Sequence, residues 1–68
     1  MDKNVSEYFS KALNDMGLEV WAKKRELEDA NKEKEPVITI AADIICVASE
    51  LLDQAAALIK PEDDEQND

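Results

Sequence analysis

A repeat in the second half of the chain limits the possible folds more than any other feature. Large apolar residues recur from Val37 to Leu58 with alanine between them, at spacings that alternate between four and three residues. Positions with this alternation share one face of an α-helix. The face consists of Val37, Ala41, Ile44, Ala48, Leu51, Ala55 and Leu58. We therefore predict a helix over about residues 37–60, although residues 37–40 in isolation also suit a short strand.

Pro36 separates this helix from a second helical pattern in the first half of the chain. Proline disfavours helix at the preceding residue and fits the first turn of a following helix. Between Val5 and Ala30, apolar residues return at helical spacing, and the alternating charges of residues 32–35 follow. We predict a first helix over about residues 5–34, so that the chain is an all-α helical hairpin.

Gly17 interrupts the first pattern and leaves two interpretations open. A helix can continue through a glycine, with or without a bend, at a cost of about 1 kcal/mol relative to alanine. Alternatively, Gly17 ends a shorter helix, and Leu18 folds back onto Leu13 in a Schellman cap. The apolar stripe keeps its phase across Gly17, which favours a single helix.

The chain is too short to depend on the core between one pair of helices. It has 68 residues, and below roughly 70–80 residues small scaffolds usually add disulfides, metals or subunits. Cys46 is the only cysteine and there is no histidine, which excludes an internal disulfide and argues against a zinc site. We expect no cofactor and no metal, and a homodimeric four-helix bundle whose second helices pack against each other. The predicted seam of this dimer and its core consists of Ala41, Ile44, Ala48, Leu51, Ala55 and Leu58. A groove for a different protein would cover the same apolar face.

The negative charge is concentrated at the C-terminus. The net charge is −9, and five acids lie in residues 61–68, whereas the other 60 residues hold twelve acids and eight bases. We predict one helical domain over residues 1–60 and a disordered acidic tail over residues 61–68. The tail either occupies a basic surface of a nucleic-acid-binding protein or only keeps the bundle in solution.

The chain has no features of a secreted or membrane protein. The first residues lack the basic segment and apolar run of a secretory signal, and an unpaired cysteine suits a reducing compartment. The apolar stretch of residues 37–59 contains Asp43, Glu50 and Asp53, and each costs roughly 2.5–3.5 kcal/mol inside a membrane. We expect a cytoplasmic protein.

The residue types of the common catalytic sites are absent. Without histidine there is no Ser–His or Cys–His pair, and carboxylates clustered on helix faces are typical of a solvated surface. Cys46 falls on such a polar face, beside Asp43 and Glu50. We therefore expect no enzymatic activity and no catalytic residue.

Leu18 and Trp21 leave the stripe of the first helix and form a second apolar spot, next to Lys24 and Arg25. Tryptophan and arginine are frequent at the energetic centres of protein interfaces. These four residues are the predicted partner-binding site. In the alternative interpretation, a bend at Gly17 turns Leu18 and Trp21 back into the core.

Three functions are compatible with these patterns. The first is an adaptor or inhibitor that binds a larger protein, and the second is an assembly module that acts only as an oligomeric bundle. The third is binding of nucleic acid, RNA in particular, through Lys23, Lys24 and Arg25, although nearby acids compete with phosphate for these bases. A short hairpin with alanine at one heptad position and an acidic end is similar in architecture to the plasmid-encoded helical dimers that modulate RNA. Short acidic helical chains are common among phage and plasmid accessory proteins, which favours a regulator.

Overall fold

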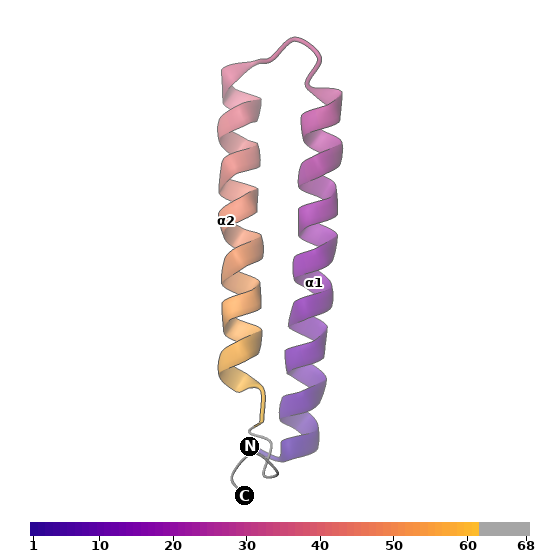
Figure 1. Cartoon of the computed structure of the whole chain (residues 1–68), viewed down its shortest axis with the longest axis vertical. Helices are drawn as coiled ribbons and strands as arrows, with labels where there is room; N and C mark the ends of the chain where they lie inside the picture. Colours follow the sequence, from indigo (N-terminus) through magenta and orange to yellow (C-terminus); the bar gives the residue numbers. More distant parts are fainter. Residues whose placement is uncertain (62–68) are drawn as a thin grey trace, which may run out of the picture.

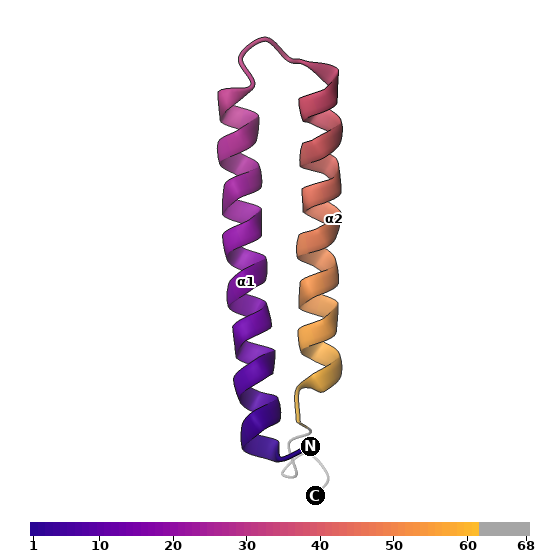
Figure 2. The same ribbon diagram turned by 180° about the vertical axis from the view of Figure 1, so that it is seen from behind.

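The computed structural model describes residues 1–61, which form two antiparallel α-helices (Figures 1 and 2). Helix α1 spans Lys3–Ala30 and helix α2 spans Pro36–Ile59. The two helices lie side by side along their length, and a loop at one end joins them (Figure 1). This arrangement confirms the predicted all-α helical hairpin. Apart from Pro61, the predicted acidic tail lies outside the described residues.

Helix α1 begins earlier than predicted because Asp2 caps it. The Asp2 carboxylate accepts a hydrogen bond from the backbone N–H of Asn4 at 2.8 Å, and the Asp2 carbonyl accepts one from the N–H of Ser6 at 2.9 Å. These bonds satisfy backbone donors that have no partner within the helix. The helix therefore starts at Lys3, two residues before the predicted start.

Helix α1 ends at Ala30, four residues before the predicted end, because Asn31 closes a turn. The Asn31 side-chain oxygen accepts a hydrogen bond from the N–H of Glu35 at 3.0 Å, and its amide nitrogen donates to the Glu35 carbonyl at 3.4 Å. Lys34 adopts a positive φ of 55°, which lets the chain reverse. The alternating charges after Ala30 thus belong to the loop.

Helix α2 begins at Pro36, as the position of the proline predicts. The Glu35 carbonyl accepts hydrogen bonds from the N–H of Ile38 and of Thr39, both at 3.1 Å, and from the Thr39 hydroxyl at 3.3 Å. The β-branched run after Pro36 is therefore helical.

Helix α1 passes through Gly17 without a break. The interpretation in which Gly17 ends a shorter helix is wrong, and the single helix is confirmed. Gly17 is buried against α2, where a Cβ atom would meet Leu52 Cβ at 3.7 Å and the Ser49 carbonyl oxygen at 3.6 Å. These are ordinary van der Waals distances, so the contact between the helices has room for a methyl group at Gly17 but not for a large side chain.

Small residues make the contact between the two helices. Ser10 and Gly17 of α1 are buried, as are Ala42, Ser49 and Ala56 of α2. The Ser10 hydroxyl donates to the Ala56 carbonyl at 2.9 Å, and the Ser49 hydroxyl donates to the Gly17 carbonyl at 3.1 Å. Small side chains let helix axes approach closely, and here the helices are close enough for side-chain hydroxyls to reach the opposite main chain.

Large apolar residues flank this contact and are only half-buried. Among the described residues, no large side chain is fully buried. The face of α2 that packs on α1 is the inward seam, which consists of Ile38, Ala42, Ile45, Ser49, Leu52, Ala56 and Ile59. The predicted seam, which runs from Val37 to Leu58 and includes Ala48, lies one residue toward the N-terminus, and we call it the outward seam. Its assignment to a contact between two copies stays a prediction.

Substitutions at Gly17 separate helix propensity from interhelical fit. In Gly17→Ala the new Cβ would lie 2.9 Å from Oδ1 of Asp53, whose exposed side chain can rotate away. We expect this variant to raise the free energy of unfolding by about 0.5–1 kcal/mol, measured by urea denaturation. Gly17→Leu should lower it by about 1–3 kcal/mol, because the larger side chain has no space. If Gly17→Leu had the higher free energy of unfolding of the two variants, Gly17 would not lie in a close contact between the helices.

Candidate interaction surfaces

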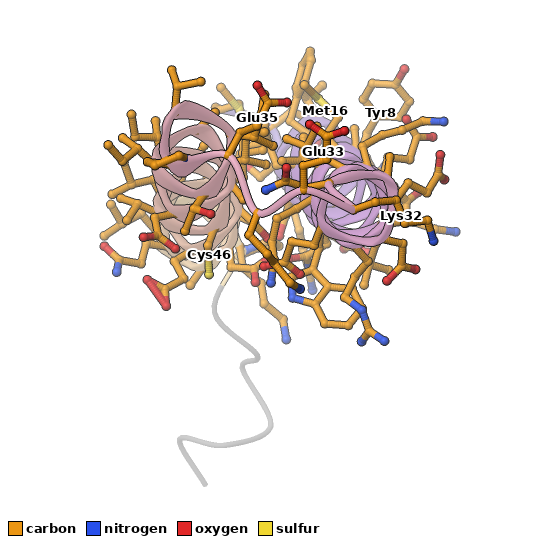
Figure 3. The ribbon with its side chains drawn as sticks, turned by 90° about the horizontal axis from the view of Figure 1, so that it is seen from above. Tyr8, Met16, Lys32, Glu33, Glu35 and Cys46 are labelled. Atoms are coloured by element: carbon orange, nitrogen blue, oxygen red, sulfur yellow. The ribbon has the colours of Figure 1, made fainter. Side chains whose placement is uncertain are left out.

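The hairpin has two sides of different character. Seen from the loop end, Tyr8 and Met16 lie on one side of the helix pair and Cys46 lies on the other (Figure 3). On α2, Ala48 directly precedes Ser49 of the inward seam, so one helical step of about 100° places it on one flank of that seam. Cys46 directly follows Ile45 of the inward seam, so the same step in the other direction places it on the opposite flank. The outward seam therefore shares a side with Met16, which we call the apolar side. The side of Cys46 is the polar side.

The large residues of the outward seam are exposed along the whole of α2, and its alanines are half-buried. Its large residues, each 57–85% exposed, are Val37, Ile44, Leu51 and Leu58. The neighbouring residues Ile40, Val47 and Gln54 are uncharged as well. The acids Asp43, Glu50 and Asp53 of α2 belong to the polar side. The apolar side of α2 is thus an unbroken strip without charge.

Helix α1 extends the apolar side only over its N-terminal half. Val5, Phe9 and Met16 are 40–49% exposed there. Beyond Met16 this side of α1 becomes charged, and Lys23 pairs with Glu26 at 3.2 Å. The apolar surface of α1 is therefore shorter than that of α2.

The four residues of the predicted partner site lie together on α1. Leu18 is 68% exposed and Trp21 is 43% exposed, so neither turns back into the core. The Nζ atom of Lys24 lies 5.6 Å from the indole centroid, and Cζ of Arg25 lies 5.1 Å from it. Both distances fall within the range of cation–π attraction. We call these four residues the Trp21 cluster.

The predicted basic cluster is engaged in local contacts. Lys23 pairs with Glu26, rather than with the Glu19 that sequence spacing favours, and Lys24 pairs with Glu28 at 3.5 Å. Arg25 lies against the indole ring. Exposed pairs of this kind contribute about 0–1 kcal/mol to stability. They nevertheless place a carboxylate beside each lysine, and a nucleic-acid phosphate would have to compete with that carboxylate.

The polar side of α2 combines Cys46 with carboxylates. Cys46 is half-buried. Within residues 1–61, no group of three or more cysteines and acids is arranged to hold a metal ion. Neither described helix has both the length and the apolar character needed to cross a membrane.

Sequence reasoning missed the role of Ser10 and Ser49 as buried contact residues. The available signal was their spacing. Ser10 lies seven residues before Gly17, and Ser49 lies seven residues from both Ala42 and Ala56, so all occupy equivalent heptad positions.

Comparisons with models of protein families, with curated proteins and with solved structures found no match to this chain.

The ion pairs of the basic cluster generate a prediction about nucleic acid. We expect no complex with single-stranded RNA or duplex DNA in a gel shift at low ionic strength, because carboxylates already occupy the positions beside Lys23 and Lys24. A retarded band that is lost in a Lys23→Gln/Lys24→Gln variant would contradict this expectation.

Proposed function

We propose that this protein is a non-enzymatic adaptor or inhibitor that binds a larger protein through the Trp21 cluster. The observation that carries the proposal is an indole ring that is 43% exposed and lies against two cationic side chains. We propose that it is a regulator of the phage or plasmid accessory type that acts in the cytoplasm.

The arrangement of the Trp21 cluster favours binding because its parts are already ordered. Lys24 pairs with Glu28, its side chain is only 15% exposed, and its Nζ atom lies over the indole ring. Pre-ordered side chains lose less conformational entropy on association. The ring and Leu18 supply apolar contact, and the exposed Arg25 supplies a fork of hydrogen-bond donors. A complementary surface would offer an apolar pocket with carboxylates at its rim.

The remaining chemistry of the chain supports binding rather than catalysis. The sequence has no histidine, and its one thiol, on Cys46, is flanked on α2 by Asp43 and Glu50. We therefore propose no reaction for this protein.

Replacing Trp21 tests the proposal. The tagged protein is used to capture its partner from host extract, the partner is identified by mass spectrometry, and the affinity of the purified pair is measured by calorimetry. Trp21→Ala should weaken binding by about 30-fold or more, as expected for a hot spot of about 2 kcal/mol. Tyr8→Ala is the matched control, because Tyr8 is an aromatic residue that is 67% exposed and, thirteen residues from Trp21, lies about 140° away from it around α1.

Circular dichroism of both variants completes the test. Unchanged helicity with lost binding in Trp21→Ala supports the proposed site. Equal affinity in wild type and Trp21→Ala contradicts it. Loss of helicity in Trp21→Ala would show instead that the ring is needed for folding.

The exposed outward seam favours an assembly module as a second candidate function. In that case the bundle itself is the function, and substitutions in the Trp21 cluster should leave every interaction of the protein unchanged. Only substitutions such as Ala48→Leu, which force neighbouring helices apart, should then matter.

A further inference from the structure

Helix α2 carries two seams with the same alternation of small and large residues, offset by one residue. In the inward seam, small residues occupy every seventh position, at Ala42, Ser49 and Ala56, with large residues between them. The outward seam repeats this pattern with Ala41, Ala48 and Ala55 as its small residues. Helix α1 covers the inward seam through a close contact of small residues. The outward seam has the same alternation of small and large residues, which allows a helix to approach closely, and its large residues are exposed.

The hairpin alone buries little apolar surface. Ala42 and Ala56 are the only hydrophobic residues among residues 1–61 that are classed as buried, and thirteen large hydrophobic residues are exposed. A two-helix hairpin of this kind lacks the core that a domain of 68 residues normally needs. The outward seam therefore requires a cover.

We propose that a second copy of this chain covers the outward seam. Helix α2 packs antiparallel against α2 of the second copy, about a two-fold axis that passes near Ala48. This inference goes beyond the proposed function and does not rest on it, because the Trp21 cluster belongs to a different part of the hairpin.

The distribution of charge favours a second copy as the occupant. Two chains of net charge −9 repel each other, and acids inside their contact would add to that repulsion and lose their hydration. The outward seam avoids this added cost, since Asp43, Glu50 and Asp53 all belong to the polar side. Two copies can thus join while their acids stay in water on the outside of the assembly.

The position of Ala48 favours the antiparallel arrangement. Helix α2 runs from residue 36 to residue 59, so Ala48 lies at its middle. A two-fold axis there places Ala41 opposite Ala55 of the second copy and Ile44 opposite its Leu51. Small residues then meet small residues and large residues meet large ones along the full helix.

The charges of α1 argue against the other two-fold arrangement. If α2 packed on α1 of the second copy, it would cover the half of α1 that carries Glu19, Lys23 and Glu26. The uncharged strip of α2 would then face charged side chains. These side chains would either hold water in the interface or lose their hydration, which costs free energy. Pairing α2 with itself avoids this contact.

The solution mass of the full chain tests the proposal. Light scattering across a dilution series should give twice the 7.6 kDa of one chain at micromolar concentration. Leu51→Lys should shift the mass toward 7.6 kDa, because it places charge in the outward seam. Leu18→Lys is the matched control, since it is the same substitution at a residue of similar exposure, 68% against 57%, outside the seam, and it should remain dimeric.

Two outcomes of the mass measurement would overturn the proposal. One is a wild-type chain that is helical and monomeric throughout the dilution series. The other is a dimer that Leu51→Lys leaves intact. If Leu51→Lys is both monomeric and unfolded, the proposal stands, because under this proposal the chain folds only when the outward seam is covered by a second copy.

Disulfide cross-linking tests the orientation. In a Cys46→Ser background, Ala41→Cys and Ala55→Cys chains are mixed and oxidised. The antiparallel dimer predicts a cross-link between the two kinds of chain. Ala41→Cys alone should give none, since its two thiols would lie about 21 Å apart along the helix, far beyond disulfide range. A strong self-cross-link of Ala41→Cys would overturn the antiparallel arrangement in favour of a parallel one.

Discussion

The close contact between small residues of α1 and α2 determines how the rest of the surface is used. Because Gly17 faces Ser49 and Ser10 faces Ala56, the helices approach until side-chain hydroxyls bond to opposite carbonyls. Small residues bury little apolar area, and the hydrophobic contribution to stability is roughly proportional to that area. The large apolar side chains lie beside the contact, where the hairpin covers them only partly or not at all. The two helices are therefore in close contact, whereas the apolar side of the hairpin stays exposed to solvent.

The two sides of the hairpin suggest a division of roles. The apolar side is uncharged over the full length of α2, which suits a contact with a second copy of the same helix. The Trp21 cluster, by contrast, has two cationic side chains over its aromatic ring, which suits a partner of different composition. In this account, self-association supplies the missing core and leaves the Trp21 cluster accessible. The two proposals are separate, so either can fail without the other.

The hairpin itself could be predicted from the sequence, because Pro36 and the helical period of the apolar residues act locally. The seam that packs within the hairpin could not be identified. The two seams of α2 differ by one residue, or about 100° of rotation, and both alternate large with small residues. The seam that packs on α1 includes Ser49, whose hydroxyl is buried and donates to the Gly17 carbonyl, although pattern analysis assigns serine to the surface. Similarly, the grouping of the Trp21 cluster followed from helical spacing, whereas the stacking of Arg25 on the ring depends on side-chain rotamers.

The central claim is that the hairpin completes its core by joining a second copy, so that folding and association are coupled. The most direct test is thermal unfolding, followed by circular dichroism at 222 nm while the protein concentration is varied about a hundred-fold. Coupled folding predicts a midpoint that rises steadily with concentration, because mass action favours the associated, folded state. A midpoint that stays constant over that range would contradict the account, since it would show that a single copy is stable with its apolar side uncovered.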